Sequence, residues 1–174
     1  MNNILVVVDM QNDFIDGALG TKEAQAIVSN VVDKVKNFEG KVLFTRDTHE
    51  ENYMDTREGR HLPVPHCIRG TVGWQIRPEL EELRTTQAID KPCFGSVELV
   101  HILSVENKKQ PIDKVCFVGL CTDICVISNA MIVKSALPEI DIEVDSACCA
   151  GVTPEKHAAA LEVMKSCQIE VIGE

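Results

Sequence analysis

The sequence predicts an α/β fold: a three-layer sandwich in which a six-stranded parallel sheet carries helices on both faces. Six short apolar segments alternate with segments whose apolar residues recur at helical spacing. The first apolar run, residues 4–8, has no polar face, as expected for a strand buried on both sides. No repeat or linker divides the 174 residues, so we expect a single domain, 1–174.

The apolar segments and the breaker residues set the order of the elements. Strands are expected at residues 4–8, 42–45, 87–90, 114–118, 140–144 and 169–172. Helices are expected at residues 22–38, 78–84, 97–105, 122–137 and 154–165, the first ending before Gly40 and the fourth before Pro138. The polar stretch 47–73, with Pro63 and Pro65, is predicted as a loop. A connection of that length usually has a function.

Charge and cysteine content exclude several classes of protein. Lys and Arg total 17 against 27 Asp and Glu, a net charge of −10, which argues against nucleic-acid and anionic-membrane partners. The N-terminal segment lacks a basic region before its apolar run, so it is not predicted to be a signal peptide. We therefore expect a cytoplasmic protein whose eight cysteines are reduced rather than paired in disulfides.

Chemically active side chains follow the predicted strands. In open α/β sheets, ligands bind beyond the carboxyl ends of the strands. The residues expected at those ends are Asp9, Asp47 with His49, Lys91, the segment 119–125 and the segment 145–148. Their joint placement predicts a site at this edge of the sheet.

Cys125 differs from the other thiols. If Thr122 caps the helix that follows, Cys125 lies in its first turn, where free N–H groups and the helix dipole favour a thiolate and lower the thiol pKa. A thiolate at that position would be a nucleophile. The alternative is a core cysteine facing the sheet. Cys148 and Cys149 also fall near a predicted strand end, but no pattern gives them a role.

Asp47, His49 and His66 form a possible metal set. Carboxylate and imidazole ligands suit Zn²⁺ or another divalent first-row ion, and His66 could reach the others if the long loop folds back. The alternative is that these three are exposed loop residues.

Five segments together resemble one family. They are VVVDMQNDF (6–14), TRDTH (45–49), PHCIRGTVG (65–73), KPCF (91–94) and GLCTDICV (119–126). In this order they resemble the isochorismatase-like cysteine hydrolases, which include nicotinamidases and N-carbamoylsarcosine-type amidases. The resemblance extends over nearly the whole chain.

The resemblance implies a role for each matching residue. Asp9, Lys91 and Cys125 would be a catalytic triad, and the backbone N–H groups of Cys121 and Cys125 an oxyanion hole. A non-prolyl cis peptide would precede Cys121. Asp47, His49 and His66 would hold a divalent metal, Zn²⁺ in the nicotinamidase branch, and Phe14 would line the substrate pocket. The family sheet has the order 3-2-1-4-5-6, and its members commonly form dimers or larger assemblies such as tetramers.

The chain also departs from the nicotinamidase pattern. Pro63 stands where an aromatic residue is common, and Asn52, Tyr53 and Asp55 occupy the neighbourhood of a further ligand His. The hypothesis is a cysteine-dependent amidohydrolase that cleaves a small amide through a thioester, converting nicotinamide to nicotinate and ammonia. One alternative is an amidase for a non-aromatic small amide or ureido compound. Another is a non-catalytic, thiol-bearing binding protein on the same scaffold.

Overall fold

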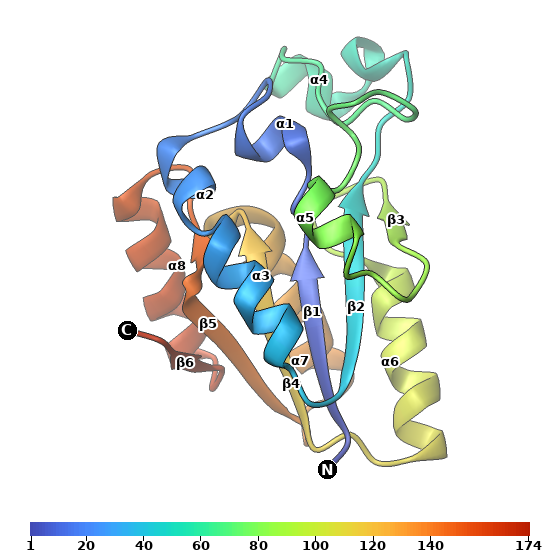
Figure 1. Cartoon of the computed structure of the whole chain (residues 1–174), viewed down its shortest axis with the longest axis vertical. Helices are drawn as coiled ribbons and strands as arrows, with labels where there is room; N and C mark the ends of the chain where they lie inside the picture. The colour runs from blue at the N-terminus through green and yellow to red at the C-terminus, as the bar shows by residue number, and fades with distance from the viewer.

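The computed structural model describes all 174 residues and contains one six-stranded sheet. Its order is β3-β2-β1-β4-β5-β6, and every neighbouring pair is parallel (Figure 1). The strands are β1 (Asn3–Val8), β2 (Lys41–Asp47), β3 (Ile89–Lys91), β4 (Lys114–Leu120), β5 (Asp141–Ala150) and β6 (Glu170–Ile172). Both the predicted fold class and the order 3-2-1-4-5-6 are confirmed.

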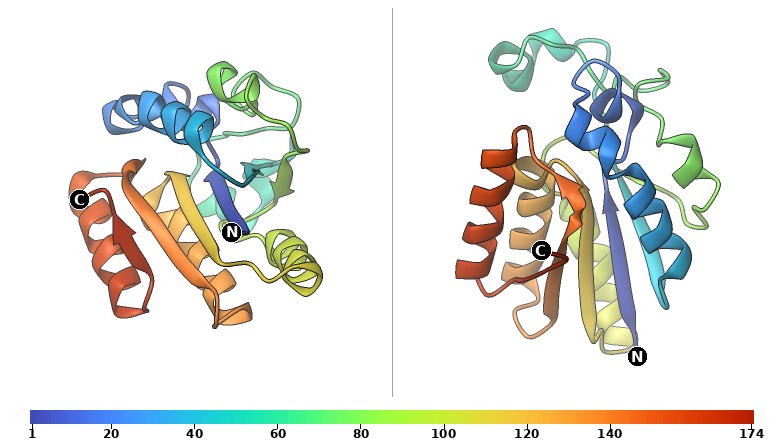
Figure 2. Two further views of the ribbon diagram at one scale, coloured as in Figure 1. Left: turned by 60° about the horizontal axis from the view of Figure 1, so that its bottom comes forward. Right: turned by 60° about the vertical axis from the view of Figure 1, so that its left-hand side comes forward.

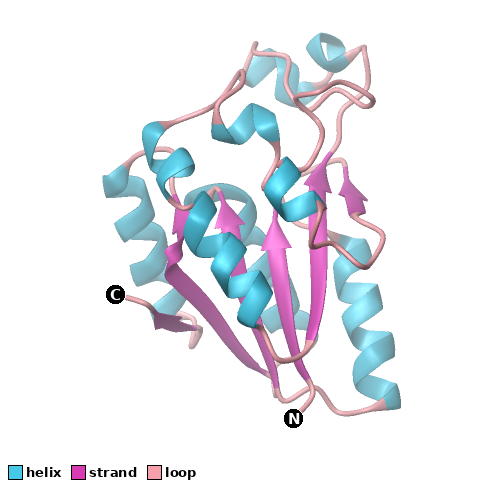
Figure 3. Cartoon of the chain, in the orientation of Figure 1, coloured by secondary structure: helices cyan, strands magenta, loops and turns pink.

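Helices cover both faces of the sheet, as Figures 2 and 3 show. One face carries α2 (Lys22–Ala26), α3 (Val28–Asn37) and α5 (Pro78–Glu81); the other carries α6 (Val97–Lys109), α7 (Ile127–Ala136) and α8 (Pro154–Ser166). The short α1 (Asn12–Ile15), η1 (Tyr53–Asp55) and α4 (Arg57–His61) lie beyond the carboxyl ends of the strands, and the π-helical turn η2 (Thr122–Val126) leads into α7. No helix is both long enough and apolar enough to span a membrane.

Strand β1 explains why two cores form. Ile4, Val6 and Val8 belong to the core beneath α6, α7 and α8, whereas Leu5 and Val7 belong to the core beneath α2, α3 and α5. All five side chains are at most 1% exposed. Successive side chains of a strand point to opposite faces, so a run without polar residues fits only the middle of a covered sheet.

The predicted helix 22–38 is two helices, because the chain bends at Ile27 between α2 and α3. The predicted loop 47–73 contains η1 and α4, and α4 begins where the Thr56 side chain accepts a hydrogen bond from Gly59 N. A Ser or Thr before such a turn satisfies one of its free N–H groups. The loop prediction was therefore wrong for residues 53–61, whereas residues 62–73 contain no helix or strand.

Strand β5 is longer than predicted. It continues past a register shift between Phe117 and Gly119 of β4, and its end pairs Cys149 with Gly119 and Ala150 with Leu120. Residues 145–148 consequently lie inside the strand and not at its end. Residues 145–148 are therefore set back from the strand ends, where the other predicted site residues lie.

Candidate active site

The ends of neighbouring strands gather the polar residues predicted from the sequence. Asp9 directly follows β1, and Asp47 and Lys91 are the last residues of β2 and β3, paired with each other in the strand register. Cys125 lies in η2, just after β4. All four side chains are buried, so a charged cluster forms at one edge of the sheet, largely shielded from solvent.

Lys91 is the centre of this cluster. Its Nζ atom lies 2.6 Å from Asp9 Oδ2 and 3.4 Å from Cys125 Sγ, and it donates a hydrogen bond to Cys93 O at 3.0 Å. The other carboxylate oxygen of Asp9 accepts a hydrogen bond from Thr45 Oγ1 at 2.7 Å. A buried ammonium is stable only when it is paired, and here the carboxylate supplies the pair.

The three side chains perturb one another. Burial raises the pKa of Asp9, with a further contribution from the charge of Asp47, while Lys91 opposes the shift. Burial and the negative charge of Asp9 raise the pKa of the Cys125 thiol well above its ordinary value, and Lys91 again opposes the shift. The predicted lowering of the Cys125 pKa by the helix was therefore wrong, because burial outweighs the helix terminus.

The local backbone around Cys125 also differs from the expected cap. Cys121 is the N-cap residue of η2 and makes no side-chain capping bond, whereas Thr122 is inside the turn and its Oγ1 lies 2.7 Å from His157 Nδ1. The Leu120–Cys121 peptide bond is cis, as the family resemblance implies. The Cys121 N–H makes no hydrogen bond within the chain, which leaves it free to donate to a ligand.

A second cluster adjoins the first. Asp47, His49, Glu58 and His66 each place one ligand atom within 4.8 Å of the other three. The Nε2 atom of His49 lies 3.0 Å from Asp47 Oδ2 and 3.5 Å from Glu58 Oε1. The Nε2 atom of His66 lies 3.6 Å and 3.7 Å from the same two oxygens. The long loop thus folds back as the metal hypothesis requires.

These four side chains fit a divalent metal. Zn²⁺ bound tetrahedrally at about 2.0–2.1 Å places neighbouring ligand atoms about 3.3–3.4 Å apart, close to the observed spacings. The other ring nitrogen of His66 is engaged by Val64 O at 2.8 Å, an arrangement that orients metal-binding imidazoles. Burial favours the neutral form of Asp47, but hydrogen bonds from His49 and His66 keep the pKa of this carboxyl well below its usual range. Asp47 is therefore ionised, as a metal ligand must be.

Glu58 was not predicted from the sequence. It comes from α4, in the segment expected to be a loop, and it completes the set, whereas His61 of the same helix is not part of the cluster. The signal that could have revealed it is the cap at Thr56, which starts a helical turn and brings the carboxylate two residues later towards His49. Because this segment was predicted as a loop, nothing distinguished Glu58 from the other acidic residues in it as a metal ligand.

A cavity of about 300 Å³ opens onto both clusters. It is lined by Phe14, Leu19, Thr21, Asp47, Glu58, Leu62, His66, Phe94, Cys121, Ile124, Cys125, Val152 and Lys156. Most of these side chains are apolar, and the predicted pocket residue Phe14 packs with its ring centroid 5.5 Å from that of His66. This volume is at the small end of ligand pockets.

The comparisons with known proteins agree with this geometry. The isochorismatase domain matches residues 3–173. The chain belongs to the isochorismatase family. The nicotinamidase/pyrazinamidase of Mycobacterium tuberculosis is 28% identical over 185 residues, covering 97% of each chain. This membership confirms the family predicted from the sequence.

Solved structures of the isochorismatase family show the same fold. Pyrazinamidase of Pyrococcus horikoshii in complex with zinc superposes with a TM-score of 0.81, at 27% identity and 100% coverage of both chains. N-carbamoylsarcosine amidase of Thermoplasma acidophilum superposes with a TM-score of 0.78, at 27% identity, covering 98% of this chain and 95% of that one.

Some residues expected near the family's site lie elsewhere. Asp145 lies within β5 and pairs with Lys34 of α3 at 2.7 Å, so the prediction that it sits at a strand end was wrong. Cys148 packs in the core beneath α3, and Cys149 in the opposite core. Neither thiol lines the 300 Å³ cavity.

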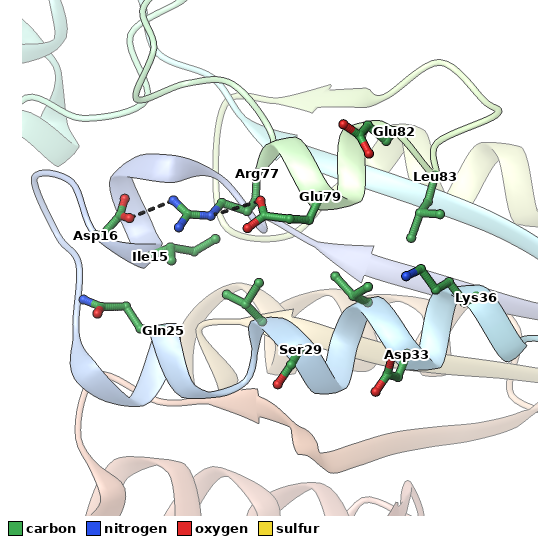
Figure 4. Close-up of a pocket in the computed structure, with 12 residues that line it drawn as sticks. Ile15, Asp16, Gln25, Ser29, Asp33, Lys36, Arg77, Glu79, Glu82 and Leu83 are labelled. Atoms are coloured by element: carbon green, nitrogen blue, oxygen red, sulfur yellow. Dashed lines mark hydrogen bonds and ion pairs between the residues drawn. The ribbon is translucent and has the colours of Figure 1, made fainter.

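A second hollow, of about 600 Å³, lies between α3 and the α1–α5 side of the molecule (Figure 4). Arg77 lies along the α1–α5 side of this hollow, 2.7 Å from Asp16 and 3.4 Å from Glu79. Its walls carry no thiol or imidazole and no buried lysine. This hollow therefore lacks the side chains expected of the family's site, whereas the smaller cavity at the strand ends has them.

Proposed function

We propose that the protein hydrolyses the carboxamide of a small molecule through a thioester on Cys125, with nicotinamide as the first substrate to test. The amide-hydrolase class follows from the family and its nicotinamidase relatives. The supporting observation is the position of Lys91 Nζ, 2.6 Å from Asp9 Oδ2 and 3.4 Å from Cys125 Sγ, beside a small and largely apolar cavity.

The first half of the proposed reaction forms the thioester. Cys125 Sγ attacks the amide carbonyl carbon while Asp9 accepts the thiol proton, and the raised pKa of Asp9 suits it to hold that proton. The tetrahedral oxyanion accepts hydrogen bonds from the N–H groups of Cys121 and Cys125. Loss of one such donor typically costs about 2.7–4 kcal/mol. The C–N bond then breaks, and Asp9 returns the proton to the leaving nitrogen, which departs as ammonia.

The second half releases the acid. Asp9, again ionised, takes a proton from water, whose oxygen attacks the thioester carbonyl carbon. The C–S bond breaks, the sulfur recovers a proton from Asp9, and the carboxylic acid leaves. Throughout, Lys91 stays charged, since the nearby carboxylates raise its pKa although burial opposes them. Its role is to stabilise negative charge on Asp9 or on sulfur.

The metal forms part of the proposal because its donor set fits. Asp47, His49, Glu58 and His66 would hold the ion. A divalent ion there would supply a positive charge that attracts a nitrogen or oxygen donor of the substrate. The apolar walls, with Phe14 and Phe94 among them, would hold the body of the substrate and exclude water.

The decisive experiment measures ammonia release from nicotinamide. Cys125→Ala should abolish it while the far-UV circular dichroism spectrum and the bound metal stay unchanged. Cys148→Ala is the matched control, since that thiol is equally buried but lies outside the cavity. Turnover by Cys125→Ala at the wild-type rate would overturn the mechanism.

A second candidate is an amidase for a small amide or ureido compound that carries a carboxylate. One observation favours it: Lys156 of α8 lines the cavity and could pair with an anionic group. The similarity to N-carbamoylsarcosine amidase agrees with this alternative. A cytoplasmic location and a dimeric or tetrameric assembly remain predictions, to be tested by fractionation and by sedimentation.

A further inference from the structure

Asn129 connects the two segments that carry Lys91 and Cys125. It lies in α7, four residues after Cys125, and its side chain is fully buried. Its amide nitrogen donates hydrogen bonds to Cys125 O at 2.8 Å and to Phe94 O at 3.1 Å. Its amide oxygen accepts a hydrogen bond from Ser96 N at 2.9 Å. Both N–H groups and the oxygen of the amide are therefore used.

The 92–96 segment, which Asn129 binds through Phe94 O and Ser96 N, makes few other hydrogen bonds. Residues 92–96 join β3, a strand of only three residues at the sheet edge, to α6. This segment supplies Cys93 O, which accepts a hydrogen bond from Lys91 Nζ, and the Phe94 ring, which lines the cavity. Gly95 lies close to α7, where an added Cβ would be 3.4 Å from Ser128 O.

We propose that Asn129 is a positioning residue for the proposed reaction: it fixes the 92–96 segment against the nucleophile turn, so that Lys91 stays beside Cys125 and Phe94 stays in the cavity wall. The inference rests on the proposed function. Asn129 itself does not line the cavity, so it acts through its three partners.

Geometry explains why such a connection is needed. A lysine side chain has four rotatable carbon–carbon bonds, so the partners of its Nζ atom decide where the charge lies. Asp9 and Cys93 O hold Nζ at 3.4 Å from Cys125 Sγ, and Cys93 belongs to the segment that Asn129 binds. The β2–β3 pairing fixes Lys91 to the sheet, but Cys125 lies in a helical turn. Among the side-chain hydrogen bonds, those of Asn129 join this turn to the 92–96 segment.

A purely structural role for Asn129 predicts a different result. Any buried amide with satisfied hydrogen bonds contributes to stability, and its loss leaves backbone groups unpaired. A positioning role also predicts that the ionisation of Cys125 changes. Asp9 and Asp47 face this thiol and raise its pKa, and Lys91 is the cation that opposes them. Movement of Lys91 away from sulfur would therefore raise the thiol pKa.

The test compares Asn129→Ala with Ser96→Ala in the full-length, metal-loaded protein. Ser96 is equally buried in the same segment, and its side chain caps α6 by accepting a hydrogen bond from Leu99 N. Its own bond to Asn129 comes from the backbone N–H, which Ser96→Ala keeps. Iodoacetamide alkylation of Cys125, followed by mass spectrometry of its peptide across a pH series, reports the thiol ionisation. Ammonia release reports kcat, and thermal unfolding reports stability.

Both variants should lower the unfolding temperature, but only Asn129→Ala should shift the alkylation profile. We expect its midpoint to rise by about one pH unit and kcat to fall about 10- to 100-fold, as displacements near 1 Å can do. Ser96→Ala should keep the wild-type profile. If Asn129→Ala does not fold, Asn129→Ser, which keeps a donor and an acceptor, should give the same shift at smaller size.

The proposal would be overturned if the folded Asn129 variant kept a wild-type midpoint and a kcat within about twofold of wild type, whatever its unfolding temperature. Alkylation needs no substrate, so this outcome is separable from failure of the proposed function. That failure would instead appear as unchanged ammonia release by Cys125→Ala.

Discussion

The carboxylate of Asp47 lies 3.5 Å from the Nζ atom of Lys91. The other oxygen of the same carboxylate lies 3.0 Å from His49 Nε2. One side chain therefore links the metal-ligand cluster to the group formed by Asp9, Lys91 and Cys125. Gln11 holds this link in place, because its side chain bonds both the N–H and the C=O of Asp47, at 2.7 and 2.8 Å.

Asp9→Asn should separate the reactivity of the thiol from turnover. The charge of Asp9 raises the pKa of Cys125, so its removal should lower that pKa and speed alkylation of Cys125 at pH 7. Ammonia release should nevertheless fall by at least about 10²-fold, because no group remains to carry the proton. Alkylation and ammonia release measured on the same preparation check the prediction.

Alkylation and ammonia release should change in opposite directions, which distinguishes the loss of the Asp9 charge from general damage. A general disturbance of the site would lower both rates together. Slower alkylation of Cys125 in Asp9→Asn would contradict the conclusion that the charge of Asp9 adds to burial in raising the thiol pKa. Asp33→Asn, on an exposed turn of α3, is the control and should change neither rate.

Glu58→Gln should weaken metal binding. The carboxylate lies 3.5 and 3.7 Å from the two imidazoles, and its replacement removes one negative charge and one good ligand. Changes in outer-shell partners alone cost about 10- to 100-fold in affinity, so we expect a loss of at least about tenfold. Competition with a coloured chelator for Zn²⁺ measures the affinity.

Glu50→Gln is the matched control for Glu58. Glu50 lies close to Glu58 in the sequence, but it is exposed and pairs with Arg69, outside the metal-ligand cluster. Its metal affinity should equal that of the wild type. Equal affinities for all three proteins would remove Glu58 from the ligand set.

The fold could be predicted because its signals are local. The run at residues 4–8 fits only a doubly covered strand, and its central place in the sheet follows. The ends of β1, β2 and β3 then place Asp9, Asp47 and Lys91 together. Chain topology alone therefore accounts for much of the site.

Two features could not be predicted, because they depend on tertiary packing. The pKa of Cys125 is decided by burial and by Asp9, which outweigh the helix terminus visible in the sequence. Asp145 faces Lys34 because β5 continues beyond the register shift. No pattern in the sequence reports either burial or the length of that strand.

Gly119→Ala should destabilise the fold far more than Gly70→Ala. Both glycines have positive φ, +116° and +83°, so alanine strains the backbone at each, by about 1–2 kcal/mol. A Cβ at Gly119 would lie only 2.1 Å from Val8 O, while one at Gly70 would meet nothing within 4 Å. We expect a loss of at least about 3 kcal/mol for Gly119→Ala in chemical unfolding. Equal losses would contradict close packing of β4 on β1.

Lys156→Met should separate the two candidate substrate classes. Lys156 is the one lysine among the residues that line the cavity, and it comes from the first turn of α8. If the substrate carries a carboxylate, this variant should raise KM for 3-carboxybenzamide about tenfold, the value of one charge-assisted hydrogen bond. KM for benzamide and nicotinamide should stay within about twofold.

The change in KM caused by Lys156→Met should depend on the charge of the substrate and not on its size. 3-Methylbenzamide has nearly the shape of the carboxylated compound without its charge, so its KM should not respond to Lys156→Met. Lys108→Met, on the exposed end of α6, should leave all these constants unchanged. A wild-type enzyme that turns over nicotinamide well and 3-carboxybenzamide poorly, with no response to Lys156→Met, would reject the anionic class. The cavity would then be one for a neutral ring.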